Sequence, residues 1–132
     1  MIYEGQVTYA SLEDKVVKES YVIEEAANFT DAEVQLTQHL AAVQDLDVVA
    51  LKRSKIKEIA NIRTDEREHL WVAEWQDSFV DEDSGETKYT RYKVLFYATT
   101  FEMAKRFICE YNKQGYDLEL VSLKMTKFID VL

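Results

Sequence analysis

The chain has 132 residues, 47% of them hydrophobic, which is enough to bury a core and excludes a compositionally disordered protein. Its 25 acidic side chains outnumber the 16 basic ones, and a formal charge of −9 disfavours binding to bare nucleic acid or anionic membranes, local basic patches aside. There is no signal-peptide pattern, and no apolar run approaches the roughly 20 residues of a membrane helix. We expect a soluble cytoplasmic protein with a single domain over residues 1–132.

The chain begins with a predicted β-hairpin. Alternating apolar residues in 2–10 predict a strand, 11–15 a turn, and the β-favouring residues of 16–26 a returning strand. These two strands are expected to pair antiparallel.

A helix and a third strand are predicted to complete this first unit. Thr30 and Glu33 match a capping box, and apolar residues at helical spacing predict an amphipathic helix over about 31–44. Residues 47–59 are expected to form the third strand, so that the first unit covers about 1–60.

The same order of elements is predicted again after a charged connector over residues 61–68. Residues 70–80 and 87–98 read as two strands, and the acidic segment 81–86 reads as the turn between them, with Gly85 able to take a positive φ.

The second unit is predicted to close as the first does. Thr99 and Glu102 offer another capping box, and Gly115 is the expected helix stop. Residues 117–131 are expected as the last strand, so that the second unit covers about 69–132.

The two units are copies of one another in sequence. The segment Asp45–Lys52 is echoed by Asp117–Lys124, and Ser54–Ile56 is echoed by Thr126–Phe128 at the same offset along the chain. A repeat that cannot bury its own apolar face is expected to pack against its copy. The sequence therefore predicts an α+β fold built by internal duplication of a strand–strand–helix–strand unit. About six mostly antiparallel strands are expected, with two helices packed on the sheet. Whether the copies share one sheet or form two is left open.

Residues with catalytic or metal-binding chemistry are scarce. His39 lies on the apolar stripe of the first predicted helix and is expected to be a partly buried structural residue. Cys109, the only cysteine, is expected to be a structural thiol, and residues 81–86 a solvated turn rather than a calcium loop. There is no glycine-rich phosphate loop and no pair of carboxylates with acid–base spacing. We expect no catalytic residue, no metal and no cofactor, and hence no enzyme.

A basic and aromatic set is the candidate binding site. Basic residues crowd the third predicted strand and recur at equivalent positions of the sixth, so a pseudo-twofold arrangement would let repeat-related lysines line a common groove. With aromatic side chains beside it, such a groove could hold single-stranded nucleic acid. The alternative is a purely structural role, in which the lysines protect strand edges against pairing and the aromatic side chains fill the core. The surrounding acidic residues favour this alternative. The candidates are Lys52, Arg53, Lys55, Lys124, Lys127, Trp71 and Trp75.

Several features of the chain together resemble a known family. These are an early aromatic in each copy (Tyr3 and Trp71), the charged hairpins, the helix start Phe29–Glu33, and Ile129–Val131 near the end. With them, nearly the whole chain resembles a domain family of unknown function that is frequent in Bacteroidetes and in their phages, including crAss-like phages. The resemblance implies a phage or mobile-element protein acting in a bacterial cytoplasm, and it brings no catalytic residues.

Surface and setting together favour a binding function. We expect a small non-enzymatic protein of phage or mobile-element origin that engages a protein partner, such as a host factor, and that self-associates as a homodimer through an exposed strand edge. The alternative is a single-stranded nucleic-acid-binding protein. A pocket for a small ligand between the copies is a third, more distant class.

Overall fold

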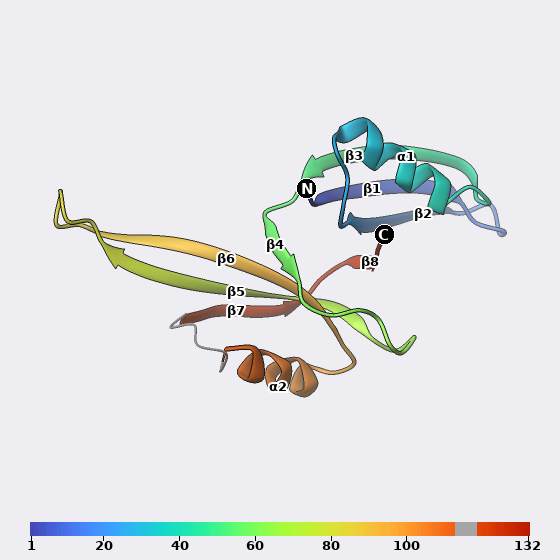
Figure 1. Cartoon of the computed structure of the whole chain (residues 1–132). Helices are drawn as coiled ribbons and strands as arrows, with labels where there is room; N and C mark the ends of the chain where they lie inside the picture. Colours follow the sequence, from blue (N-terminus) through green and yellow to red (C-terminus); the bar gives the residue numbers. More distant parts are fainter. Residues whose placement is uncertain (113–118) are drawn as a thin grey trace. The chain divides into compact units, whose positions relative to one another are not determined.

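The computed structural model describes residues 1–112 and 119–132, which form eight strands and two helices (Figure 1). The chain divides into two compact units. Unit 1 consists of Met1–Lys55 with Lys127–Leu132, and unit 2 consists of Ile56–Thr126. Each unit has a four-stranded, mostly antiparallel sheet with a helix packed on it, so the predicted α+β class is confirmed and there are two sheets.

Unit 1 contains strands β1 (Tyr3–Ala10), β2 (Val16–Ile23), β3 (Gln44–Arg53) and β8 (Phe128–Val131), with helix α1 (Phe29–His39). The strand order in its sheet is β3-β1-β2-β8. Strand β1 pairs antiparallel with both β2 and β3, whereas β8 runs parallel to β2. The first hairpin is therefore confirmed, and a strand from the far end of the chain extends its sheet.

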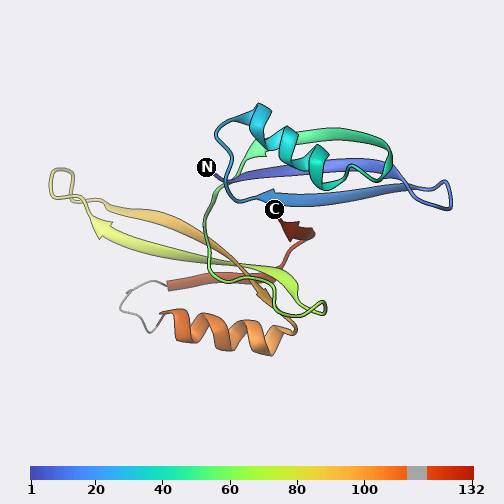
Figure 2. The same ribbon diagram turned by 45° about the vertical axis from the view of Figure 1, so that its right-hand side comes forward.

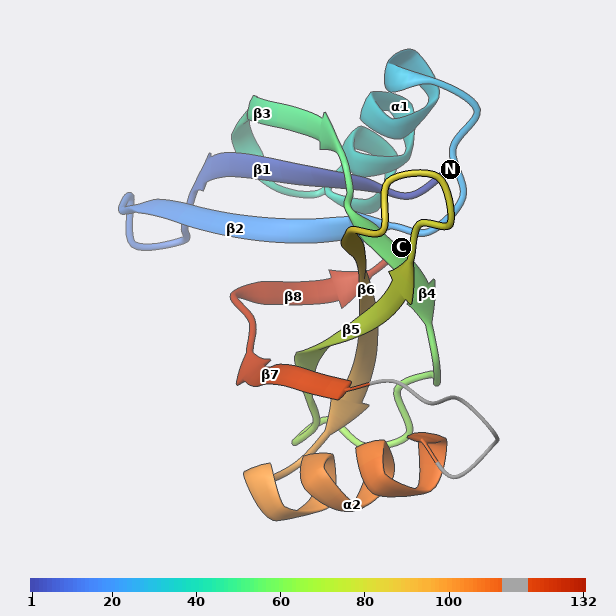
Figure 3. The ribbon, with the colours of Figure 1, turned by 90° about the vertical axis from the view of Figure 1, so that its left-hand side faces the viewer.

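Unit 2 contains strands β4 (Ile56–Ile59), β5 (His69–Val80), β6 (Thr87–Ala98) and β7 (Glu119–Met125), with helix α2 (Phe101–Asn112). Its strand order is β4-β6-β5-β7, in which β5 pairs antiparallel with β6 and β7, and β4 runs parallel to β6 (Figure 3). The sheet of unit 2 is thus laid out as that of unit 1.

The hairpin of β5 and β6 is the longest in the molecule's described part, with 12 residues in each strand (Figure 2). At its tip, the amide of Asp81 donates to the carbonyl of Glu86 at 2.9 Å, and Gly85 has a φ of 70°. The ammonium of Lys88 lies 2.8 Å from the Asp81 carboxylate. Residues 81–86 form the predicted turn, and Gly85 has the predicted positive φ.

The closing strands differ from the prediction. Each was expected as one continuous strand, over 47–59 and 117–131. Each is instead interrupted, directly after the last backbone hydrogen bond of its antiparallel pairing. The amide of Ser54 donates to the carbonyl of Ile2 at 2.9 Å, and the amide of Thr126 donates to that of Leu70 at 2.9 Å. Beyond each break, the chain enters the sheet of the other unit. No glycine or proline marks these positions, so the sequence predicted six strands where the described part of the chain has eight.

The register of the strands shows the duplication directly. Gly5 of β1 pairs with Tyr21 and Leu51 on its two sides, and Tyr21 pairs with Asp130 of β8. In unit 2, Ala73, Val94, Leu123 and Glu58 take the corresponding places. Leu51 and Leu123 are separated by the offset of the sequence repeat, and so are Glu58 and Asp130. The predicted repeat is therefore a structural repeat, in which each copy contributes its last strand to the sheet that the other copy begins.

The helices begin at positions other than the predicted capping boxes. Asn28 is the N-cap of α1, and its side chain accepts from the Asp31 amide at 2.8 Å. For α2, the Thr100 hydroxyl accepts from the Met103 amide at 3.3 Å, one residue after the predicted Thr99. Helix α1 ends at His39 rather than near 44 because β3 already begins at Gln44. The predicted stop at Gly115, like residues 117 and 118 of the last strand, lies outside the described residues.

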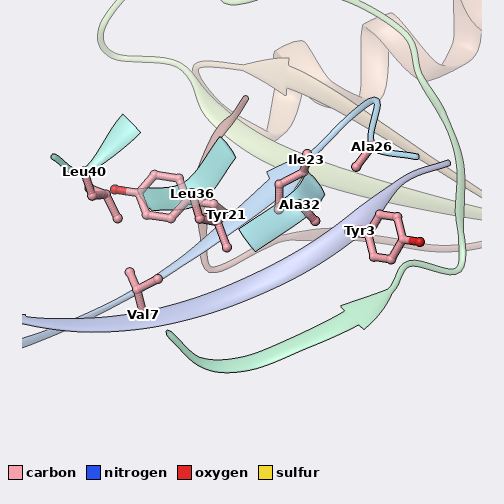
Figure 4. Packing of buried hydrophobic residues seen from close by; sticks show 8 residues of the cluster. All are labelled: Tyr3, Val7, Tyr21, Ile23, Ala26, Ala32, Leu36 and Leu40. Atoms are coloured by element: carbon pink, nitrogen blue, oxygen red, sulfur yellow. The ribbon is translucent and has the colours of Figure 1, made fainter. Parts of the chain in front are cut away.

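Each sheet buries one face against its helix. In unit 1, cluster 1 comprises Tyr3, Val7, Tyr21, Ile23, Ala26, Ala32, Leu36 and Leu40. Figure 4 shows the β1 and β2 side chains of this cluster on the side where those of α1 lie. In unit 2, cluster 2 comprises Trp71, Ala73, Trp75, Val94, Phe96, Ala98, Ala104 and Ile108. The helix positions Ala32 and Leu36 recur as Ala104 and Ile108, again at the offset of the repeat.

Within the part of the chain that the structure describes, no helix has the length and hydropathy needed to cross a lipid bilayer.

Candidate functional site

The two faces of the unit 1 sheet differ in polarity because side chains alternate along each strand. On β1, Tyr3, Gly5 and Val7 are buried toward α1. Glu4 and Gln6 point to the other face and are only partly buried. This second face carries polar and charged side chains, and it is where the unit contains a groove.

The unit 1 groove has a volume of about 400 Å³ and crosses all four strands of the sheet. Gln6 and Ser20 contribute an amide and a hydroxyl from β1 and β2, and Ala50 and Phe128 contribute apolar surface from β3 and β8. Its charged lining residues are Glu4, Lys52 and Lys127. The size falls in the range of sites for small molecules or for a few side chains of a peptide.

Two of the predicted basic residues meet in this groove. Lys52 lies on β3 beside Glu4, with 3.7 Å between its ammonium and the carboxylate, and its side chain is 76% exposed. Lys127 is also exposed and reaches the groove just before β8. The Glu4 side chain is only 20% exposed, but the long contact and the exposure of Lys52 leave the Lys52 ammonium available to a ligand.

The other predicted basic residues lie elsewhere. Arg53 is exposed at the end of β3, and its guanidinium donates to the Met1 sulfur at 2.6 Å. Lys55 is exposed between β3 and β4, and Lys124 is exposed on β7 in unit 2. The basic residues that line the unit 1 groove are Lys52 and Lys127, while Lys124 belongs to unit 2, so the expected Lys52–Lys124 pairing stays a prediction.

The two tryptophans of the candidate binding site are core residues of unit 2. Trp71 is 7% exposed and Trp75 is 1% exposed. The Trp71 indole donates to the Ala98 carbonyl at 2.9 Å, and Trp75 stacks on Tyr111 at 5.3 Å between ring centroids. Neither ring therefore offers a face to a nucleic-acid base, and the prediction of Trp71 and Trp75 as binding residues is wrong.

Two tyrosine–carboxylate clusters were missed at the level of sequence. In unit 1, the hydroxyls of Tyr9 and Tyr21 both donate to the carboxylate of Glu19. The pKa of Tyr21 is raised, first by burial and then by the bond to Glu19. The pKa of Tyr9 is raised mainly by its bond to the same carboxylate. All three residues belong to the β1–β2 hairpin, so the predicted hairpin register could have revealed them.

The second cluster joins three different elements of unit 2. The hydroxyls of Tyr92 on β6 and Tyr111 on α2 both donate to the carboxylate of Glu58 on β4. The Tyr92 hydroxyl lies 3.1 Å from the carboxylate oxygen. Burial and the bond to Glu58 raise the pKa of Tyr111. In both clusters the hydroxyl protons are already donated to the carboxylate, an arrangement that fastens elements together. No sequence signal indicated the second cluster, because β4 was predicted as the end of one continuous strand over 47–59 and not as a separate strand beside β6.

The remaining candidates for chemistry lie apart from one another. His39 is exposed at the end of α1 rather than partly buried, and it lies edge-on to the Tyr21 ring at 5.5 Å between ring centroids. Cys109 is exposed on α2, whereas structural cysteines of the expected kind are commonly buried. Among the described residues, no group of three or more histidine, cysteine or acidic side chains could hold a metal ion.

Comparison with known proteins gives a family and no activity. A family model matches residues 1–132, and its description is "Domain of unknown function (DUF4494)". No curated protein and no solved structure matches the chain.

Proposed function

The chain belongs to the DUF4494 family of domains of unknown function, and from the unit 1 groove we propose that it is a non-enzymatic protein that binds another protein. The observation that carries this proposal is the meeting of Lys52 and Lys127 in one groove with Gln6, Ser20 and Phe128. Two ammonium groups beside an amide, a hydroxyl and an apolar surface suit an extended peptide with acidic side chains.

A protein partner is favoured over nucleic acid by the charges. The chain carries a formal charge of −9, and Glu4 lines the groove with its carboxylate 3.7 Å from Lys52. A phosphate backbone would meet this carboxylate at every approach to Lys52, whereas a peptide can place one acidic side chain and one neutral group there. The burial of Trp71 and Trp75 removes two of the aromatic surfaces on which single-stranded nucleic acid could stack.

We further propose the biological setting that the resemblance implies. The protein would be of phage or mobile-element origin and would act in the cytoplasm of a bacterial host, with a host protein as its partner. The acidic hairpin tips, at Glu13–Asp14 and Asp81–Glu86, would add electrostatic steering toward a partner with a basic rim.

Single-stranded nucleic acid remains the second candidate because Lys52, Lys127 and the aromatic Phe128 line the same groove. Binding of this kind would weaken steeply with salt, since counterions are released when phosphates are neutralised.

An affinity capture from host lysate, followed by mass spectrometry, tests the proposal. The bait is the wild-type chain, the variant Lys52→Glu/Lys127→Glu, or the control Lys15→Glu/Lys105→Glu. The control makes the same charge change at two exposed lysines outside the groove. We expect one protein that is captured by the wild type and the control, is lost with the groove variant, and persists after nuclease treatment.

Two other results would decide against it. A protein captured equally by all three baits would place binding outside the groove. Partners that vanish after nuclease treatment, with salt-dependent binding of a labelled single-stranded oligonucleotide that the groove variant loses, would establish the second candidate instead.

A further inference from the structure

We propose that β8 can leave β2 of its own chain and pair with β2 of a second copy, giving a dimer in which each unit 1 is closed by the β8 of the other chain. Such an exchange requires an acceptor surface that the exchanged strand does not itself help to build. A short connection before the exchanged strand favours the exchange. Both are present in this fold.

The connection to β8 is a single residue between two anchored ones. Thr126 is held in unit 2, where its amide and hydroxyl donate to the Leu70 carbonyl at 2.9 and 2.8 Å. Phe128 is already paired with Ser20 in unit 1. Only Lys127 lies between them, and a connection this short favours exchange because it limits how the strand can dock within its own chain.

The acceptor surface is made by the segment Met1–Lys55 alone. Strand β8 pairs with β2 through Ser20–Phe128, Tyr21–Asp130 and Val22–Val131. The amide of Leu132 then donates to the Val22 carbonyl at 2.8 Å, and its side chain packs on cluster 1. A second copy offers the same groups, so the pairing is the same within one chain or between two, and only the entropy of association differs.

The chain already contains one exchange of this kind, between its two repeats. Strand β4 of the first repeat lies in the sheet of unit 2, and β8 of the second repeat lies in that of unit 1. Strand β4 is the less suited to leave, because unit 2 is one continuous segment and Glu58 is fastened there by Tyr92 and Tyr111. Strand β8 closes the unit that is built from two separate segments.

The exchange has a consequence for the groove. Lys127 and Phe128 line the groove and move with β8, so in the dimer each groove would combine Lys52 of one copy with Lys127 and Phe128 of the other. This consequence rests on the proposed function, whereas the exchange itself does not.

Disulfide trapping between two full-length chains tests the exchange. Both chains carry Cys109→Ser, since Cys109 is an exposed free thiol. One carries Ser20→Cys and the other Phe128→Cys, so each has one thiol, and the two thiols face each other only when β8 of the second chain pairs with β2 of the first. The chains are refolded together at high concentration and oxidised. A chain with Leu12→Cys, at a fully exposed turn, replaces the Ser20→Cys chain to measure random collision.

We expect the mixed covalent dimer to exceed both homodimers and the collision control several-fold. A chain carrying Ser20→Cys and Phe128→Cys together, refolded at high dilution, should close its disulfide within one chain. If that chain closes but the mixed dimer stays at the level of the control, exchange between copies does not occur. If it stays reduced, the Ser20–Phe128 pairing is wrong and the proposal falls with it. A trapped dimer whose partner capture survives Lys52→Glu/Lys127→Glu would refute the proposed function and leave the exchange intact.

Discussion

Unit 1 and unit 2 share the order and register of their strands but differ in how the chain builds them. Unit 2 is one continuous segment, Ile56–Thr126, while unit 1 combines Met1–Lys55 with the distant Lys127–Leu132. The sequence repeats, at about 1–60 and 69–132, therefore do not coincide with the structural units. A repeat found by sequence can thus be a unit of duplication without coinciding with a compact structural unit.

The units also fill equivalent positions differently. The ring pair Tyr3–Phe29 in unit 1 corresponds to Trp71–Phe101 in unit 2, with centroids 5.1 and 6.0 Å apart. Gly5 under Leu36 corresponds to Ala73 with Ile108. The framework thus tolerates changes of volume when a neighbour changes with them, as is known for protein cores.

The largest difference in stability is expected between two fragments of the chain, one that follows the structural units and one that follows the sequence repeats. A fragment of residues 56–126 keeps all four strands and the helix of unit 2 and should unfold cooperatively. A fragment of 69–132 keeps the whole second repeat but lacks β4 with Glu58, and it lacks Asn61. The Asn61 side chain accepts a hydrogen bond from the Tyr97 amide at 2.6 Å and donates one to the Tyr97 carbonyl at 3.0 Å. It should show no cooperative transition. Tryptophan fluorescence in a urea titration reports both, because Trp71 and Trp75 lie in both fragments. Equal stability of the two fragments would contradict the division into units.

The next largest effect is expected at the helix positions that face each sheet. Leu36→Ala and Ile108→Ala each remove a fully buried side chain and should lower the free energy of unfolding by about 2–5 kcal/mol. Chemical denaturation followed by circular dichroism measures both. Val34→Ala, at an exposed position of α1, serves as the control and should cost much less. A loss below about 1 kcal/mol at either core position would show that the two units are not packed alike.

A smaller effect is expected where the two cores differ in volume. A Cβ at Gly5 would lie 2.5 Å from Cδ1 of Leu36, so Gly5→Ala should destabilise the protein by about 1–3 kcal/mol through overpacking. The double variant Gly5→Ala/Leu36→Ile reproduces the pair found in unit 2 and should regain part of the loss in the same denaturation assay. No recovery would mean that the clash is relieved in another way in unit 2.

The smallest effect is a pH dependence at the tyrosine–carboxylate clusters. The raised pKa values of Tyr21 and Tyr111 favour the neutral hydroxyl in the folded state, relative to an ordinary value of 10.0. Their contribution to stability is therefore complete below pH 10 and is lost as the pH rises above it, by at most about 1.4 kcal/mol per pH unit for each tyrosine. Urea midpoints between pH 8 and pH 11 measure it. Tyr21→Phe and Tyr111→Phe should flatten the decline, and Tyr89→Phe, at an exposed position, is the matched control for the substitution itself.

Local sequence signals were sufficient to predict the hairpins and helices, and the sequence repeat was sufficient to predict the order in which these elements recur. They failed where the chain changes sheets. The pattern of apolar residues continues across Ser54 and Thr126 without a glycine or proline, so nothing local shows that β4 and β8 leave the preceding strand. Periodicity placed Trp71 and Trp75 on one face of a strand but did not tell which face α2 covers.

The groove could be predicted only in part, for the same reason. Sequence spacing paired Lys52 with Lys124, as the repeat suggests. Within unit 1, Lys127 reaches the groove because β8 joins β2 through Ser20 and Phe128, which lie far apart in the sequence. A contact of this range depends on the whole topology, which periodicity and composition do not encode.

The discontinuity of unit 1 also bears on biosynthesis. A ribosome makes residues in chain order, so every residue of unit 2 is available before Phe128–Val131 has been made. The β1–β2 hairpin is thus made before unit 2, but its sheet is completed only after unit 2, and the edge of β2 that receives β8 stays unpaired until then. In a polysome, where several nascent chains lie near one another, that interval is when a strand from a neighbour would have the best opportunity to enter.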